Sequence, residues 1–498
     1  MDITLEYAHP TTLVTTPTTT TLDVATNIHR PGVQFHGRVR DPLLFRQMLL
    51  AQHACILNTG DRDTWLDNDE WLETLDPVVT VYPDEIVFEV FSHEGGCYGL
   101  LTAPLSAFEI EGEVHPGTTN IDFSWDLREV LQGIRSSRQT YLTIGQSDAT
   151  AARDSLGQNH FERRVSVPDR WLRSFLQMQG SQTASPFFIT VHPVDLLNAL
   201  TYLREHRTYR SPQGIRYEMQ PDTSVKMILE PWDEVITLRD THYTGFPRTV
   251  RVWGRKRLGV LQDVLPFAQR VTIGILGRGL PHIYTVHCGP FRLTIALSSW
   301  TPNDSSSNAF DLTAQQGPAN EEHIRQLVAL LGTHNGMRRN ALLGATDLTT
   351  TELEQALLHL CRSGRALYDP ATATIRLRDF LQEPVDTASL FPPDPRLAAA
   401  QMLLDTDQVH LQEGEKSYYG QKNIIAVIHD GVDYEVTCSL DNNGRIKYGR
   451  CGCSFFLANI MSRGPCSHIL AARLAYDAHT EDVTAQDDDD DDDSDDEE

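Results

Sequence analysis

Three cysteines and one histidine near the C-terminus have the spacing of a metal site. A C-G-C sequence at 451–453 is followed, after twelve residues, by C-S-H at 466–468. Thiolate and imidazole are ligands that Zn²⁺ prefers, and four protein ligands complete a tetrahedral site with no position left for water or substrate. We therefore predict a structural Zn²⁺ ion, and the predicted metal ligands are Cys451, Cys453, Cys466 and His468. The alternative is four buried side chains that hold no metal.

The flanking residues indicate how these ligands are positioned. Apolar residues alternate with polar ones in 436–440 and resume at 446–448, and turn residues at 441–444 separate the two runs. This pattern is typical of strands joined by a turn. An earlier apolar run, 424–428, leads into His429-Asp430-Gly431, another hairpin signal. After the last ligand, Ile469, Leu470, Ala472 and Leu474 fit one face of a helix. Cys466 and His468 would then lie in its first turn, where N–H groups stabilise thiolate charge.

The order C-x-C then C-x-H, with a hairpin before and a helix after, resembles the bacterial SWIM-type zinc-finger family. The resemblance covers roughly residues 420–476, and Ala471 also matches the small residue usual in the family. It implies the same four metal ligands, a finger that is not itself an enzyme, and DNA or protein partners. It also implies a partnership with AAA+ ATPases and von Willebrand A-type proteins, which accompany bacterial relatives of this architecture.

The charge of the chain is concentrated at its end. The 498 residues carry a formal charge of −26, and residues 487–498 contribute eleven acidic side chains, so −15 remains for 1–486. Such a self-repelling tail is expected to be disordered. The acidic remainder argues against a general nucleic-acid coat protein, which would be basic. A local basic patch around the finger is a candidate nucleic-acid surface, with a mixed solvated face as the alternative: Arg445, Lys447, Arg450, Arg463 and Arg473.

Residues 319–380 resemble a winged-helix domain. Apolar periodicity predicts helices near 324–331, 339–345 and 350–360, the last opened by a capping box of Thr349 and Glu352. Two short strands at 366–368 and 374–378 follow. In DNA-binding members of this class the third helix enters the major groove and the wing touches phosphate. The expected exposed face of that helix is not basic, since it carries Thr350, Thr351, Glu354 and Gln355. Arg376 and Arg378 are better candidates for nucleic-acid contacts, and contact with protein remains equally open.

A weak internal repeat is present in the sequence of the N-terminal region. The sequence Val-Leu-Gln at 130–132 precedes Thr-Ile-Gly at 143–145, and both triplets recur at 260–262 and 272–274. Repeated units of helix and strands suggest an α+β region built by duplication. The arrangement is similar to the duplication of helix and meander in DNA sliding clamps. The alternative is a single irregular α+β domain.

Motif searches predict a protein without catalytic activity. The chain lacks the G-x-x-x-x-G-K-[ST] loop and the G-x-S-x-G elbow. His93 and Cys97 could form a base and nucleophile pair, but residues so close in one turn rarely have that geometry. No run of 18 apolar residues suggests a membrane span and no secretory signal is apparent. Eight scattered cysteines suit a reducing compartment, so a cytoplasmic location is expected.

The predicted fold is α+β and multidomain. We expect a large α+β N-terminal region (1–310), a winged-helix-like domain (318–382), a linker with a short helix (383–410), a SWIM zinc finger (411–480) and a disordered acidic tail (481–498). The predicted function is non-enzymatic binding of nucleic acid, with DNA preferred, of protein partners, or of both. The alternative is a protein adaptor that does not touch nucleic acid.

Overall fold

The computed structural model describes most of the chain between residues 2 and 490. The positions outside the described part are 1, 8, 31, 58–75, 123–126, 146–160, 167–168, 185, 209–212, 277–279, 299–318, 382–384, 392–393, 413–421, 441–445, 462 and 491–498. Residues 311–317, between the expected N-terminal region and the winged-helix-like domain, fall in these gaps. Residues 481–490 of the expected disordered tail instead belong to helix α13 (Ser467–Asp490), and residues 491–498 lie outside the described part.

The fold is α+β, as the sequence predicts, and it divides into two compact units. The first unit consists of Met1–Gly277, Pro281–Ser306 and Pro318–Leu390, and the second contains Phe391–Glu498 with two short segments. The winged-helix-like residues therefore pack with the N-terminal region as one unit. No described helix is long and apolar enough to cross a membrane.

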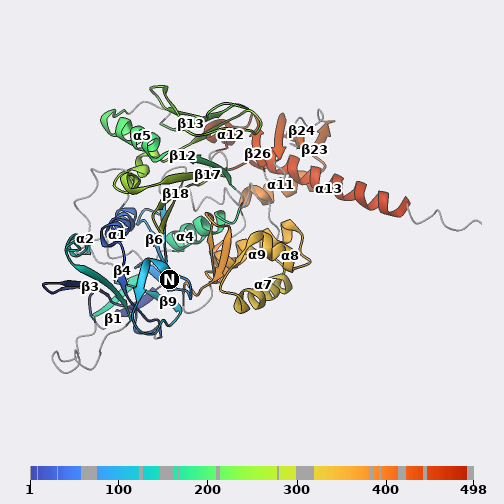
Figure 1. The fold of residues 1–498 in the computed structure, drawn as a ribbon. Helices are drawn as coiled ribbons and strands as arrows, with labels where there is room; N and C mark the ends of the chain where they lie inside the picture. Colours follow the sequence, from blue (N-terminus) through green and yellow to red (C-terminus); the bar gives the residue numbers. More distant parts are fainter. Residues whose placement is uncertain are drawn as a thin grey trace, which may run out of the picture. The chain divides into compact units, whose positions relative to one another are not determined.

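An eight-stranded antiparallel sheet forms the centre of the first unit (Figure 1). Its strands, in spatial order, are β12 (Phe187–Val191), β17 (Arg270–Ile275), β18 (His282–Cys288), β19 (Phe291–Leu297), β7 (Cys97–Pro104), β6 (Glu85–Phe91), β5 (Val78–Val81) and β9 (Gly117–Asn120). Helix α1 (Pro42–Ile56) packs on β6 and β7. Asp41 caps this helix by accepting a hydrogen bond from the Leu44 N–H.

Three smaller groups of strands complete the N-terminal part. A five-stranded sheet has the order β2 (Thr12–Thr15), β3 (Thr19–Val24), β10 (Gln139–Ile144), β4 (Phe35–Val39) and β8 (Phe108–Ile110). A four-stranded sheet has the order β15 (Glu234–Thr237), β14 (Lys226–Leu229), β13 (Ile215–Met219) and β16 (Arg248–Val252). A separate pair consists of β1 (Asp2–Tyr7) and β11 (Phe161–Ser166).

The two copies of the weak internal repeat have similar helices and strands around them. In the first, α2 (Leu127–Gln132) leads into β10, which pairs antiparallel with β4, the strand before α1. In the second, the 3₁₀ helix η4 (Arg255–Leu261) leads into β17, which pairs antiparallel with β12, the strand before α5 (Pro193–Glu205). The apolar residue of each Thr-Ile-Gly triplet, Ile144 and Ile273, is fully buried. Both copies of the repeat therefore place a core residue on a strand that lies next to a helix.

The winged-helix-like segment has the expected elements. They are α7 (Glu321–Thr333), β20 (Met337–Arg338), α8 (Arg339–Ala345), α9 (Thr350–Arg362), β21 (Ala366–Asp369) and β22 (Thr374–Leu377). The capping box of Thr349 and Glu352 is present at the start of α9. A helix that the periodicity does not reveal, α4 (Asp169–Ser181), packs against α9. The ring of Phe175 on α4 also contacts the rings of Phe91 and Tyr98, so α4 fills the space between the central sheet and the winged segment.

The second unit consists of a four-stranded antiparallel sheet and three helices. The strand order is β23 (Val409–Gln412), β24 (Lys422–Asp430), β25 (Val432–Leu440) and β26 (Ile446–Arg450), and the helices are α11 (Pro395–Asp405), α12 (Ser454–Asn459) and α13 (Ser467–Asp490). Helix α13 packs on α11 and on the three strands β23 to β25. Ala400 of α11 is fully buried in this core. The residues expected to be a linker before 411 therefore belong to the packed module.

Candidate metal centre

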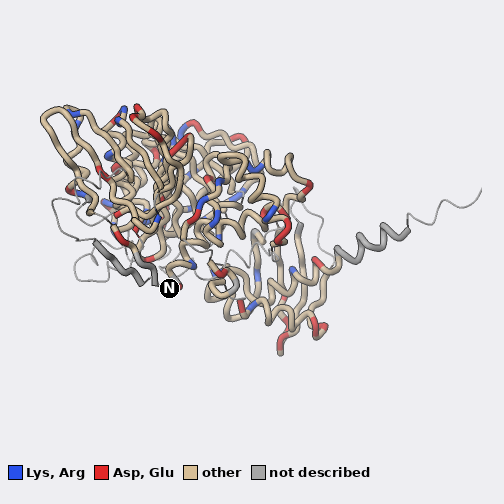
Figure 2. Tube along the Cα trace, turned by 90° about the horizontal axis from the view of Figure 1, so that it is seen from below, with Lys and Arg blue, Asp and Glu red and all other residues tan. Residues whose placement is uncertain are grey.

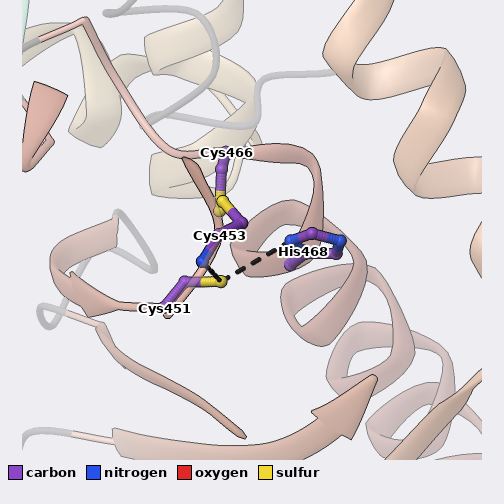
Figure 3. Close-up of side chains that lie close together, drawn as sticks. All are labelled: Cys451, Cys453, Cys466 and His468. Atoms are coloured by element: carbon purple, nitrogen blue, oxygen red, sulfur yellow. Dashed lines mark hydrogen bonds between the residues drawn. The ribbon is translucent and has the colours of Figure 1, made fainter. Parts of the chain in front are cut away.

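The four predicted metal ligands converge in the core of the second unit. One ligand atom from each of Cys451, Cys453, Cys466 and His468 lies within 4.8 Å of all the others. All four residues are buried, with exposed fractions of 1–7%. Figure 3 shows the three sulfur atoms and the imidazole ring directed toward one another. The C-x-C and C-x-H spacing therefore identifies a real cluster of side chains.

Different elements of the second unit position the two ligand pairs. Cys451 directly follows β26, and Cys453 is the N-cap of α12. Cys466 immediately precedes α13, whose second residue is His468. Strand β26 approaches α13 closely at Gly449, where a Cβ atom would lie 2.8 Å from the Ile469 Cδ1 atom. A glycine at this point is what allows the strand and the helix to meet.

Backbone N–H groups stabilise negative charge on the sulfur atoms. The Cys453 N–H donates to Cys451 Sγ at 3.4 Å, and the Phe456 N–H donates to Cys453 Sγ at 3.4 Å. The Ile469 N–H at the start of α13 bonds to the sulfur of Cys466. Donors of this kind orient metal ligands and tune their basicity. Each of the three sulfur atoms therefore has a backbone N–H partner that the local turn or helix end supplies.

A hydrogen bond between two of the thiols shifts their pKa values in opposite directions. The pKa of Cys451 is lowered to about 4, first because Cys466 donates a hydrogen bond to its sulfur and also because of the bond with His468. The same bond raises the pKa of Cys466, and burial adds to that rise. Burial lowers the pKa of His468, but its bonds with Cys451 and Asp430 outweigh burial and raise it. The arrangement favours the thiolate form of Cys451, and a bound cation would take over the role of the shared protons.

The distances fit a zinc ion. Zn–S and Zn–N bonds of about 2.3 and 2.0 Å at a tetrahedral angle place sulfur and nitrogen about 3.5 Å apart. The His468 Nδ1 and Cys451 Sγ atoms are 3.5 Å apart. Three sulfurs and one nitrogen, buried and without an open position, suit a structural ion that would tie β26 to α13. The chemistry such an ion supplies is cross-linking, since no ligand position is left for a substrate.

Two residues next to His468 were not anticipated from the sequence. The His468 Nε2 atom lies 3.1 Å from Asp430 Oδ2, and the Tyr434 ring stacks on the imidazole with centroids 4.4 Å apart. Both residues belong to the β24–β25 hairpin. The His429-Asp430-Gly431 turn signal places a carboxylate at a hairpin tip, but only the packed structure brings that tip to the metal cluster.

Helix α11 holds the loop between the two ligand pairs. The Arg396 guanidinium donates to the carbonyl oxygens of Arg463 and Pro465, at 2.6 and 3.1 Å. It also pairs with Asp394 at 2.9 Å and lies over the Phe455 ring, 4.9 Å from its centroid. Arg396 therefore fixes the approach to Cys466, although the sequence indicates only a linker helix here.

The basic residues proposed around the finger have different surroundings. Arg450 and Arg463 are exposed. Arg473 instead donates to Asp477 at 2.7 Å within α13, and its side chain is 12% exposed. Arg445 lies outside the described residues, as does the side chain of Lys447. Figure 2 shows Lys and Arg interspersed with Asp and Glu along the trace rather than gathered in one long basic segment.

The assignment of Arg376 and Arg378 to a nucleic-acid surface is wrong. The Arg378 side chain is fully buried and its Nε atom lies 3.0 Å from Glu89 Oε2. Arg376 is 13% exposed and pairs with Asp84 at 2.7 Å and with Glu85 at 3.1 Å. The acidic partners are on or next to β6, so these arginines attach the winged segment to the central sheet. Arginines held in this way have no guanidinium free for phosphate.

The expected exposed face of α9 is also partly covered. Glu354 is 5% exposed and forms an ion pair with Arg339. On the α4 side, a Cβ atom on Gly180 would lie 2.7 Å from the Leu358 Cδ1 atom, which shows how closely the two helices pack. Thr350 and Thr351 of the expected face are exposed, so burial affects only part of it. The winged segment is a packing element of the first unit.

Comparisons with known proteins give no family. No family model matches the chain, and no curated protein matches it. Among solved structures, the chain is similar to the proliferating cellular nuclear antigen of Entamoeba histolytica, with 12% identity over 54% of this chain and 99% of that chain and a TM-score of 0.36. It is also similar to PCNA from Thermococcus kodakaraensis, with 13% identity over 53% of this chain and 100% of that chain and a TM-score of 0.34. The chain is similar as well to the PCNA2–PCNA3 complex of Sulfolobus tokodaii, with 10% identity over 53% of this chain and 98% of that chain and a TM-score of 0.36. At these scores we base no functional argument on the likeness.

Proposed function

We propose that this protein is a zinc-binding, non-enzymatic interaction protein whose second unit is a SWIM-type finger. The observation that carries the proposal is the convergence of four buried ligand atoms from Cys451, Cys453, Cys466 and His468. A closed set of four ligands holds structure together and leaves no position for catalysis. The finger then presents a rigid surface to nucleic acid, with DNA preferred.

Arg450 and Arg463 are the residues that support a nucleic-acid surface on the finger. Both side chains are exposed, and each lies shortly before one of the two ligand pairs in the sequence. Contacts from so few cations give weak binding that depends strongly on salt. The eleven carboxylates of residues 487–498 compete with phosphate for the same arginines.

Fluorescence anisotropy with labelled duplex DNA, duplex RNA and single strands tests this surface. We expect the combined change Arg450→Ala and Arg463→Ala to reduce the salt slope of binding by about two, because each phosphate contact contributes about one. Removal of residues 487–498 should raise the affinity. The matched control is Arg325→Ala, since Arg325 is an exposed arginine of the first unit that pairs with Glu322. An unchanged salt slope in the double variant would rule out this surface.

A second candidate function is that of an adaptor for other proteins. Two apolar side chains between the ligand pairs, Leu457 and Ile460, are 64% and 46% exposed. Contiguous exposed apolar surface marks protein contact sites, and these two side chains are three residues apart in the sequence. The partners we propose are an AAA+ ATPase and a von Willebrand A-type protein.

A pull-down with nuclease treatment separates the two functions. Retention of protein partners after nuclease digestion, and their loss in a Leu457→Ser, Ile460→Ser variant, would favour the adaptor. Loss of all partners on nuclease treatment would favour nucleic-acid binding.

A further inference from the structure

We propose that Asp430 is a positioning residue for the metal centre: its carboxylate holds His468 in the tautomer that presents Nδ1 to the metal. This inference rests on the zinc site of the proposed function. It gives the β24–β25 hairpin, which supplies no metal ligand itself, a defined part in metal binding.

The two ring nitrogens of His468 face different partners. Nδ1 lies 3.5 Å from Cys451 Sγ, on the side of the sulfur cluster. Nε2 lies 3.1 Å from Asp430 Oδ2, on the side of the hairpin. The imidazole is buried, with its side chain 5% exposed, so neither nitrogen can exchange its partner for bulk water.

The chemistry of these partners fixes the tautomer. An ionised carboxylate can only accept a hydrogen bond, so the proton of a neutral imidazole is held on Nε2 when Asp430 is opposite. The lone pair of Nδ1 is then directed at the sulfurs and available to a cation. A carboxylate behind a metal-bound histidine also raises the basicity of the ligand. Without Asp430, the neutral ring could carry its proton on Nδ1, where it would block the metal.

The hairpin is built to hold Asp430 in place. Asp430 and Val432 pair across the turn, and Gly431 between them has φ of +71°, a conformation that glycine adopts without strain. Tyr434, two residues after Val432, stacks on the imidazole with an interplanar angle of 25°. The Asp430 carboxylate and the Tyr434 ring therefore contact His468 from the same hairpin.

A purely structural ion pair would behave differently. The Asp430 side chain is 59% exposed, and pairs with exposed partners contribute little to stability. If Asp430 acted only in this way, its removal would change neither the metal affinity nor the ligand geometry. A positioning role changes the metal affinity.

The test measures metal affinity in the full-length protein by competition for Zn²⁺ with a chromophoric chelator. Asp430→Ala is expected to weaken Zn²⁺ binding 10- to 100-fold, the range typical for loss of a hydrogen-bond partner of a ligand. Asp430→Asn should give a smaller loss, because its amide oxygen still accepts a hydrogen bond but carries no charge. The control is Asp433→Asn on the same hairpin, since Asp433 pairs with the exposed His429 at 2.8 Å.

Absorption of the Co²⁺-substituted protein gives a second readout. The sulfur-to-cobalt charge-transfer bands should persist in Asp430→Ala at saturating Co²⁺, and half-saturation should shift to higher Co²⁺ concentration. Equal Zn²⁺ and Co²⁺ affinities in wild type and both Asp430 variants would overturn the positioning role and leave the zinc site standing. A wild-type protein that binds neither ion would overturn the zinc site itself.

Discussion

The winged segment and the four-ligand cluster of the second unit both appear in the sequence as binding regions, but the structure treats their predicted residues differently. Arg376 and Arg378 belong to a hairpin that would touch phosphate, and instead they pair with carboxylates of the same unit. Cys451 and His468 are expected to meet, and they do. An arginine can be paired by any nearby acid in the fold, whereas three thiols and an imidazole at this spacing have few stable arrangements other than a metal site. Spacing of metal ligands is therefore a better guide to function than local positive charge.

The largest effect is expected from breaking the metal centre. Cys453→Ser should remove zinc and unfold residues 394–480, because a structural zinc contributes roughly 10–16 kcal/mol of apparent binding free energy. The first unit should stay folded, since its core is a separate cluster. Hydrogen exchange followed by mass spectrometry on the full chain reads both units at once. Cys438→Ala is the control, because Cys438 is buried in the same core but is not among the clustered ligands.

Loss of protection in the first unit as well would show that the two units do not fold independently. Retention of zinc by Cys453→Ser would show that the cluster binds metal in another way.

A smaller effect is expected from breaking the buried ion pair of the winged segment. Glu89→Gln leaves the Arg378 charge buried without its counterion, and such changes cost about 3–5 kcal/mol. Glu89 also accepts a hydrogen bond from the Tyr98 hydroxyl at 2.9 Å, and Gln179 donates to it. Urea unfolding of the first unit measures the loss. Asp84→Asn is the control, because Asp84 is 56% exposed and its pair with Arg376 should contribute less than about 1 kcal/mol.

Zinc content should be unchanged in both variants. If Glu89→Gln lowered the free energy of unfolding by less than about 1 kcal/mol, Arg378 would not depend on Glu89 as its counterion and would again be a candidate for ligand contacts.

Mild acid should destabilise the first unit through buried histidine. Burial, and secondarily Arg257, lowers the pKa of His282 to about 3, and neither ring nitrogen has a hydrogen-bond partner among the described residues. Below about pH 6.5 the unfolded state binds a proton that the folded state does not, so stability falls as the pH falls. Between pH 7.5 and 5 the loss is about 2 kcal/mol, from 1.5 pH units at 1.36 kcal/mol each.

Urea unfolding of His282→Leu at the two pH values tests this linkage. The variant should lose about 2 kcal/mol of the pH dependence and keep its stability at pH 7.5, whereas the part that comes from the buried His53, whose pKa burial lowers to about 4, should remain. An equal pH dependence in wild type and variant would assign the acid sensitivity to other groups.

Local patterns predict elements well, and they do not predict what covers an element. The capping box at Thr349 and the cap at Asp41 mark helix starts because they depend on neighbours within four residues. Glu354 looks exposed in the sequence, and it is buried because Arg339 supplies a counterion from outside the helix. Helix α4 contains the buried Gln177 and Gln179, polar residues that hide its role in the core.

The same limit applies at the candidate metal site. The four ligands follow from their spacing, but Asp430 is 38 residues from His468 and Arg396 is 67 residues from Arg463. Contacts at such separations depend on how β24, β25 and α11 pack, which no local signal contains. The residues that tune a site are therefore harder to find than the residues that form it.

The most direct test is the metal content of the purified full-length protein, measured by inductively coupled plasma mass spectrometry beside a Cys466→Ser variant. The account predicts one zinc per wild-type chain and a strongly reduced content in the variant. Wild-type protein without zinc, after purification in zinc-containing buffer free of chelators, would contradict it.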